Sequence, residues 1–241
     1  MVLIFHVSDL HFGAEDKAAL DWFVLEAHNH KPSAIIVTGD LTMRARHHEF
    51  AAARNWLMDL PAPVSVEIGN HDIPYFNPVA RFLRPYDRFE LIERFVERPL
   101  ELPNVEIIPM PTTARAQWRL NWSKGHVARW RLGAAVEAVR ESTRRHRLVA
   151  CHHPLIDPKT RATTHTRGGA RALEALVNAG ATAVLSGHVH DPYDVKVEVN
   201  GKPIRLVGAG TLSERVRATA PSYNAIFADR DALDVEIRFA A

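Results

Sequence analysis

Cysteine is almost absent from this chain, since Cys151 is the only one among 241 residues. An internal disulfide is therefore excluded, and cysteine usage does not identify the redox compartment. A marked excess of one charge is absent as well, because the formal net charge is +2 at pH 7. Nothing in that total requires nucleic acid or an anionic membrane as a partner, so neither is expected. Cys151 itself lies in a predicted strand and is expected to be an inert core residue.

Long hydrophobic runs are missing too. No stretch approaches the roughly 20 apolar residues that a membrane-spanning helix needs. The first strand-like run begins at residue 2 with no basic region before it, so we expect no signal peptide and a cytoplasmic location. Repeats, low-complexity tracts and linker-like segments are absent. We therefore expect a single domain over residues 1–241, and the sequence is compatible with a homo-oligomer.

Histidine is the residue type in clear excess, with fourteen copies, and several of them follow predicted strands. Five strand-like runs are expected at residues 2–7, 34–38, 64–68, 148–151 and 182–186. They run into Ser-Asp-Leu-His at 8–11, Gly-Asp at 39–40, Gly-Asn-His-Asp at 69–72, His-His-Pro at 152–154 and Gly-His-Val-His at 187–190. In open α/β sheets, ligands gather outside the carboxyl ends of strands, so these five ends should converge on one crevice.

The spacing of apolar residues predicts the rest of the architecture. Helical patterns lie at 16–28, 49–60, 79–95 with a break at Pro85, 128–147 and 170–178. The β-α-β-α-β order of the first part predicts parallel strands with right-handed crossovers. A further strand is expected at 105–110. Beyond Gly187, alternating runs at 193–199, 204–208, 223–228 and 233–239, the first pair joined by Asn200-Gly201, predict two antiparallel hairpins.

Each polar motif has an ordinary explanation when it stands alone. An Asp-x-His pair is usually surface decoration, a Gly-Asp after a strand is usually a turn, and His-His-Pro can begin a helix. More specific is Gly69, which lets the backbone turn sharply and present three polar side chains together. His188 and His190 point to one side of an extended segment. The joint occurrence of all five motifs, each behind a strand, favours a functional site.

Together the motifs resemble the calcineurin-like metallophosphoesterase superfamily, whose pattern D-x-H, G-D, G-N-H-[DE], H and G-H-x-H stands intact between Ile4 and His190. With Gly39-Asp40-Leu41-Thr42 and His152-His153-Pro154, the chain is most similar to the bacterial class III cyclic-nucleotide phosphodiesterases. The resemblance implies a four-layer α/β/β/α sandwich of two mixed β-sheets flanked by helices. The second sheet is expected to contain the 105–110 strand and the C-terminal hairpins.

The candidate ligand atoms are carboxylate oxygens, imidazole nitrogens and an amide oxygen, with no thiolate. This set suits Mn, Fe, Zn or Co. The resemblance implies two divalent transition-metal ions. One is assigned to Asp9, His11, Asp40 and His190, and the other to Asp40, Asn70, His152 and His188. Asp40 is then shared by both ions, and Asp40 and His71 are the expected catalytic residues.

The activity that the resemblance implies is hydrolysis of phosphodiesters by a metal-activated hydroxide, with 3′,5′- and 2′,3′-cyclic nucleotides as candidate substrates. His71 is expected to act as an acid or to stabilise phosphoryl oxygens. Asn70, His71 and Arg44 are the candidate substrate contacts. A monoester dianion usually needs additional cationic groups, and the sequence offers only Arg44 and Arg46, so a diester is favoured. The alternatives are a phosphomonoesterase, a nuclease and a non-catalytic protein-binding scaffold; the complete ligand set argues against the scaffold.

Several residues keep more than one interpretation. Asp72 either orients His71 or caps the next turn, and His153 either supports the ligands or packs. The 157–169 loop, with His165 and Arg167, is a candidate cover for the site. The 73–104 segment is rich in arginine and aromatic residues, and it suits a lip that stacks a nucleobase, a dimer surface or plain packing. Its residues of interest are Tyr75, Phe76, Arg81, Arg84, Tyr86, Arg88 and Arg94.

Overall fold

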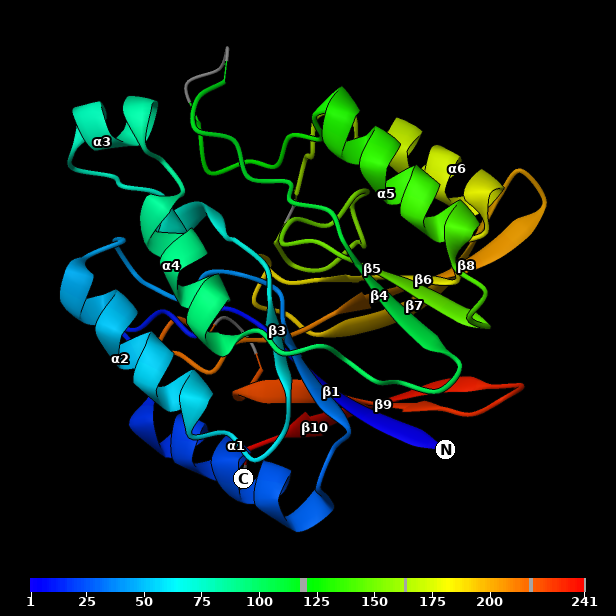
Figure 1. The fold of residues 1–241 in the computed structure, drawn as a ribbon, viewed down its shortest axis with the longest axis horizontal. Helices are drawn as coiled ribbons and strands as arrows, with labels where there is room; N and C mark the ends of the chain where they lie inside the picture. The colour runs from blue at the N-terminus through cyan, green and yellow to red at the C-terminus, as the bar shows by residue number, and fades with distance from the viewer. Residues whose placement is uncertain (118–120, 163, 217–218, 241) are drawn as a thin grey trace.

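Two five-stranded β-sheets lie face to face at the centre of the molecule (Figure 1). The structure is a computed structural model that describes residues 1–117, 121–162, 164–216 and 219–240. The first sheet has the order β10-β9-β1-β2-β3 and the second the order β4-β5-β6-β8-β7. The first contains β1 (Val2–Val7), β2 (Ala34–Val37), β3 (Val64–Val66), β9 (Ser222–Ala228) and β10 (Leu233–Phe239). The second contains β4 (Val105–Pro109), β5 (His146–Ala150), β6 (Ala183–Ser186), β7 (Tyr193–Val199) and β8 (Lys202–Gly208).

Helices cover the outer face of each sheet. The first sheet carries α1 (Lys17–His30), α2 (His47–Met58) and α4 (Asp87–Val96), and the second carries α5 (Arg129–Glu141) and α6 (Gly169–Ala179) (Figure 1). A short helix, α3 (Pro78–Leu83), and the single turn η1 (Asn70–Asp72) lie in the connections. This arrangement confirms the four-layer sandwich. None of the described helices has the length and apolar character needed to cross a membrane.

The alternation of side chains along β1 explains why the sheets stack. Phe5 packs into the core under the helices of the first sheet, while its neighbour Ile4 packs into the layer between the two sheets. Successive residues of a strand point to opposite faces, so a strand buried on both sides must be apolar throughout. Phe5 and Ile4 are both completely buried. Truncating Phe5 to alanine would therefore cost about 3–5 kcal/mol of stability.

The last hairpin joins a different sheet from the one expected. β9 pairs antiparallel with β1, with Phe5 opposite Ala225, and β10 extends the first sheet from β9. Only the β7–β8 hairpin joins β4 in the second sheet, so the assignment of both hairpins to that sheet was wrong. Six of the seven residues of β9 are buried, which requires a position inside a sheet and under a helix. Its alternating pattern is equally compatible with either sheet.

The helix expected over residues 128–147 is shorter than its sequence pattern. α5 ends at Glu141, Ser142 adopts an extended conformation, and β5 begins at His146. The backbone N–H of His146 donates to the carbonyl of Asn104 at 2.8 Å. Residues 146–147, which the helical spacing assigned to the helix, therefore pair with β4 as part of β5. The break predicted at Pro85 is confirmed, because it separates α3 from α4.

Candidate metal centre

The loops after β1 and β2 are joined by their backbones. The N–H groups of Asp9 and His11 donate to the carbonyls of Gly39 and Asp40, each at 3.0 Å. Both donors have a positive φ, 56° for Asp9 and 47° for His11, and Asp40 has a φ of 52°. This pairing holds the carboxylate and the imidazole of one loop beside the carboxylate of the other.

Five of the seven candidate ligands share a left-handed backbone. His188 and His190, with φ of 70° and 60°, join Asp9, His11 and Asp40 in this region. Residues other than glycine rarely adopt it, and strained conformations of this kind cost about 1–3 kcal/mol each and cluster at functional sites. The fold thus holds five polar residues in a conformation that their own preferences oppose.

The first group of ligands gathers around Asp9. The Nε2 atom of His190 lies 3.0 Å from Asp9 Oδ1, and His11 Nε2 lies 3.6 Å from the same oxygen. His11 Nε2 is also 3.8 Å from Asp40 Oδ2. His190 Nδ1 donates to the backbone carbonyl of Arg215 at 2.8 Å, so its Nε2 faces inward.

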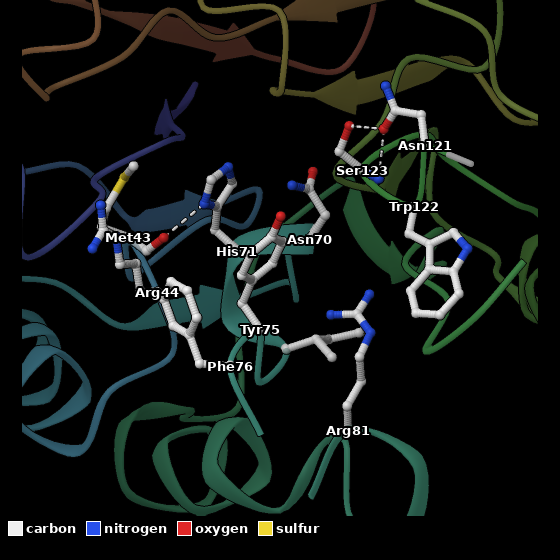
Figure 2. Close-up of a pocket in the computed structure, with 11 residues that line it drawn as sticks. Met43, Arg44, Asn70, His71, Tyr75, Phe76, Arg81, Asn121, Trp122 and Ser123 are labelled. Carbon is white, nitrogen blue, oxygen red and sulfur yellow. Dashed lines mark hydrogen bonds between the residues drawn. The ribbon is translucent and has the colours of Figure 1, made fainter. Parts of the chain in front are cut away.

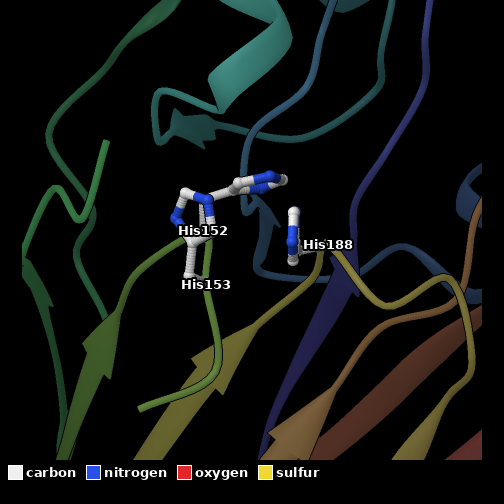
Figure 3. Close-up of side chains that lie close together, drawn as sticks. All are labelled: His152, His153 and His188. Carbon is white, nitrogen blue, oxygen red and sulfur yellow. The ribbon is translucent and has the colours of Figure 1, made fainter. Parts of the chain in front are cut away.

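The second group gathers around His152. Its Nδ1 donates to the carbonyl of Thr38 at 2.7 Å, and its Nε2 lies 3.3 Å from Asp40 Oδ2 and 3.2 Å from Asn70 Oδ1. The ring of His188 lies 5.2 Å from that of His152, centroid to centroid (Figure 3). Asp40 Oδ2 therefore lies between the two groups, where the sequence pattern had expected the shared ligand.

The glycines of the motifs are required because the ligands pack against their backbone. A Cβ atom on Gly39 would lie 2.7 Å from His152 Nδ1, and the φ of Gly39 is +91°. A Cβ atom on Gly69 would overlap both the backbone and the carboxylate of Asp40. A side chain at either position would push apart the residues that the two motifs bring together.

Charge in this buried cluster favours ionised carboxylates. Burial alone would raise the pKa of Asp40, but His152, His71 and His11 lower it on balance. The same opposition of burial and histidines leaves the pKa of Asp9 well below its ordinary value. Burial would lower the pKa of His152, yet Asp40 raises it to about 9. The carboxylates thus hold their negative charge and draw a proton onto an adjacent imidazole.

The hydrogen bonds show that the cluster fits a cation. With Nδ1 donating to a carbonyl, a neutral His152 or His190 carries a lone pair on Nε2. The Nε2 lone pair of His152 faces oxygens of Asp40 and Asn70. The Nε2 lone pair of His190 faces Asp9 Oδ1. Acceptors that face one another need a proton or a metal ion between them. Among the described residues, Asp9 Oδ1 has no hydrogen-bond partner although it is buried, which is unusual for such an atom.

Two residues of the motifs, His153 and Asp72, support the loops of the site through hydrogen bonds. His153 Nε2 donates to the Ser123 carbonyl at 2.9 Å, and its Nδ1 forms a hydrogen bond with Thr112 Oγ1 at 2.9 Å. Although its ring lies close to that of His188 (Figure 3), no nitrogen is left for a metal ion. Asp72 accepts backbone N–H groups of Leu41, Thr42 and Gly69. It thus ties the two loops together, and no contact with the His71 ring is present.

His71 faces the cluster from outside, together with Arg215, a residue that the sequence analysis did not identify. His71 Nδ1 contacts the carbonyl of Met43 at 2.7 Å, so its Nε2 is exposed to the site (Figure 2). Arg215 Nη1 lies 3.1 Å from His71 Nε2 and 3.4 Å from His11 Nε2. Arg215 belongs to the connection between β8 and β9, which carries no recognised motif. The pairing of β9 with β1, together with backbone contacts of residues 211–214 to the loop after β1, brings it here.

The basic residues proposed near the substrate have different positions. Arg44 lines a cavity of about 870 Å³ beside Asn70 and His71 (Figure 2). Arg46 lies 4.0 Å from Glu49 at the start of α2. Of the five arginines in the 73–104 segment, only Arg81 lines the cavity, and no described residue of the 157–169 loop does. The backbone of Arg167 pairs instead with Gly125 and Val127.

Comparison with known proteins gives one family. A sequence profile described as calcineurin-like phosphoesterase matches residues 2–192. That range contains all the candidate ligands and His71, whereas Arg215 lies beyond it. No curated protein sequence matches the chain.

Solved structures match at the level of the fold. A dimetal phosphatase from Danio rerio is 12% identical with a TM-score of 0.68, over 99% of this chain and 96% of that chain. A purple acid phosphatase from yellow lupin (Lupinus luteus) seeds is 11% identical with a TM-score of 0.67, over 99% of this chain and 51% of that chain. The anchor in the inner membrane complex of Plasmodium is 12% identical with a TM-score of 0.63, over 98% and 84%. This fold therefore occurs in phosphatases and in an anchor protein alike.

Proposed function

Because the chain belongs to the calcineurin-like phosphoesterase family and retains every candidate ligand of its motifs, we propose that it is a dinuclear metal-dependent phosphodiesterase. The observation that carries this proposal is the convergence of acceptor atoms on Asp40 and Asp9, because His152 Nε2 and His190 Nε2 both face carboxylate oxygens at 3.0–3.3 Å. A scaffold has no use for such a cluster of strained, buried ligands.

In the proposed enzyme, Asp9, His11, Asp40 and His190 would hold one divalent ion, and Asp40, Asn70, His152 and His188 would hold the other. The bound ions would supply Lewis-acid activation of water and neutralise charge on the phosphoryl oxygens. The protein residues orient the ligands: the carbonyls of Thr38 and Arg215 hold His152 and His190. Such hydrogen bonds behind the ligands commonly affect metal affinity or activity by 10–100-fold.

The substrate side of the site consists of Asn70, His71 and Arg215. Since the Nδ1–H of His71 faces the Met43 carbonyl, its Nε2 accepts from Arg215 in the neutral ring and can donate to a phosphoryl oxygen only in the imidazolium. The Arg215 guanidinium can donate to phosphoryl oxygens of a bound ester in either case. In this role the guanidinium stabilises negative charge as it grows during the reaction. As an imidazolium, His71 is also in a position to give a proton to the leaving oxygen, and a comparison of esters with good and poor leaving groups separates the two roles.

Arg215 changes the argument about substrate charge. The preference for a diester rested on Arg44 and Arg46 as the only cations near the site, and Arg215 adds a third that is closer to the cluster. A monoester dianion would therefore have a partner. We retain the diester as the proposed substrate because the motifs resemble those of cyclic-nucleotide phosphodiesterases, and no longer because of charge balance. The proposed preference is thus smaller than the sequence suggested.

The test combines metal content with hydrolysis. Purified protein, stripped by chelation and titrated with Mn, Fe, Zn or Co, should bind close to two equivalents per chain and hydrolyse bis(p-nitrophenyl) phosphate faster than p-nitrophenyl phosphate. Asp40→Asn should lower the affinity for both ions and lower activity by more than about 100-fold. This is more than the loss usual for residues that hydrogen-bond to the ligands. A stoichiometry of one or zero, or no hydrolysis with any of these metals, would favour the anchor-like use of the fold.

A further inference from the structure

The cavity beside the candidate metal centre has an aromatic wall that the proposed chemistry does not use. Asn70 and His71 line the end of the cavity at the ligand cluster, and Tyr75, Phe76 and Trp122 line the part beyond them (Figure 2). Its volume of about 870 Å³ is within the 300–1,000 Å³ range of small-molecule sites. A group attached to a phosphorus atom at the cluster would extend into this space.

The aromatic rings of this wall are exposed rather than part of the core. Tyr75 is 74% exposed and Phe76 is 65% exposed, and neither belongs to any of the three hydrophobic clusters of the described chain. Their rings contact each other edge to face at 5.1 Å. Exposed aromatic residues at the mouth of a site are suited to bind a flat partner, because every such partner offers a π-face.

Two arginines complete the cavity without an acidic partner. Arg81 is only 7% exposed, and its Nε and Nη1 donate to the carbonyls of Arg115 and Pro74. Its guanidinium lies 5.2 Å from the centre of the Trp122 ring, and that of Arg44 lies 5.7 Å from the Phe76 ring. Within the described chain, neither arginine forms an ion pair, and no acidic side chain lines the cavity.

This combination fits a nucleotide. Flat heterocycles stack on aromatic rings and on guanidinium planes, and their ring nitrogens and carbonyls accept N–H donors such as those of arginine. A simple alkyl ester would leave the exposed aromatic surface uncovered, and a carbohydrate would offer no π-face. The absence of acidic residues from the described lining also suits a ligand that carries phosphate.

We propose that this cavity is a subsite for the nucleobase of a nucleotide substrate, with the base stacked against Phe76 and Trp122 and its edge facing Arg81. The inference rests on the proposed function, because it assumes that the phosphoryl group lies at the metal centre. It specifies the substrate class as a nucleoside phosphoester rather than any ester of suitable charge.

The test compares two ligands that differ only in the base. Isothermal titration calorimetry of the Mn²⁺-loaded protein measures the dissociation constants of adenosine 5′-monophosphate and ribose 5-phosphate. We expect the nucleotide to bind about 5- to 150-fold more tightly, which corresponds to the 1–3 kcal/mol of base–aromatic stacking. Phe76→Ala and Trp122→Ala should each reduce that ratio while leaving ribose 5-phosphate unchanged. Trp130→Ala removes a tryptophan that is 72% exposed on α5 and should leave the ratio intact.

The outcomes are distinguishable from failure of the proposed function, because hydrolysis of bis(p-nitrophenyl) phosphate is measured on the same preparations. Equal binding of the two ligands by an active enzyme would overturn the subsite, as would a variant that weakens both ligands alike. A base-dependent ratio in a protein without hydrolytic activity would uphold the subsite and contradict the enzyme. Phe76 lies outside the core, so Phe76→Ala keeps the test valid even if Trp122→Ala unfolds the 121–124 loop.

Discussion

Replacing Arg215 by alanine should slow hydrolysis of a phosphomonoester more than that of a phosphodiester. The guanidinium lies 3.1 Å from His71 Nε2 and 3.4 Å from His11 Nε2, so it borders both the substrate-facing imidazole and the ligand cluster. A phosphoryl oxygen bound between these groups would accept a charge-assisted hydrogen bond. Lysine at this position keeps the charge but loses the planar fork that matches phosphate, so Arg215→Lys should be intermediate.

The magnitude follows from the strength of that hydrogen bond. A hydrogen bond to a charged group contributes about 1.5–3 kcal/mol, and 1.36 kcal/mol corresponds to a factor of ten in rate. Arg215→Ala should therefore lower kcat/KM for the monoanionic diester by about 10- to 150-fold. Because Coulomb energy is proportional to the product of the charges, the dianionic monoester should lose about twice as much free energy, or at least about 100-fold.

The assay is kcat/KM for bis(p-nitrophenyl) phosphate and p-nitrophenyl phosphate, with metal content measured on each preparation. Arg230→Ala, an exposed arginine in the turn between β9 and β10, serves as the matched control and should change neither substrate. Unchanged rates in Arg215→Ala would refute the phosphate contact. A loss that is equal for both substrates and accompanied by lost metal would assign Arg215 to the support of the cluster, where its carbonyl already holds His190.

Two further predictions concern His71 and Glu67. His71→Ala should slow esters with poor leaving groups about 10²–10⁴-fold more than nitrophenyl esters if His71 gives a proton to the leaving oxygen, and equal losses for both would assign it to charge stabilisation. Burial raises the pKa of Glu67 well above its ordinary value of 4.5, and Glu97 and Glu93 raise it further. The protonated Glu67 side chain therefore contributes fully to the stability of the folded state below pH 4.5, and this contribution is lost as the pH rises through the raised pKa. Glu67→Gln should therefore raise the melting temperature more at pH 8 than at pH 5, by about 3–5 °C per pKa unit of the shift. Parallel pH profiles would contradict this.

The parts of the site that the sequence predicted are those set by strand ends. The runs ending at Val7, Val37 and Ala150 are parallel strands whose carboxyl ends share one side of the sandwich, so the residues after them converge whatever the intervening helices do. The left-handed backbone of Asp9 and Asp40 could not be predicted, since neither is glycine. It arises from the pairing of two loops that are distant in sequence.

The parts that the sequence missed depend on contacts between distant segments. Arg215 reaches the site because β9 inserts beside β1 and the β8–β9 connection contacts the loop after β1. An alternating pattern does not say which sheet a hairpin will join. Tyr75 and Phe76 belong to the segment for which a lip was one expectation, but Trp122, which joins them in the cavity wall, comes from a separate connection without a periodic pattern. Arg46, by contrast, looked equivalent to Arg44 in the sequence, yet it lies beside Glu49 at the start of a helix.

The hydrogen bonds explain why the histidines of the motifs were easier to predict than Arg215. His152, His190 and His71 each have Nδ1 held by a backbone carbonyl, that of Thr38, Arg215 or Met43. A carbonyl is supplied by any residue at its position, so these imidazoles are aimed by the path of the chain alone, and a short motif is sufficient to specify them. Substrate contacts depend on particular side chains from remote loops. Substitutions at Thr38 keep the backbone carbonyl that holds His152, so they should leave the metal affinity unchanged. Substitutions of Arg215 should lower kcat/KM instead.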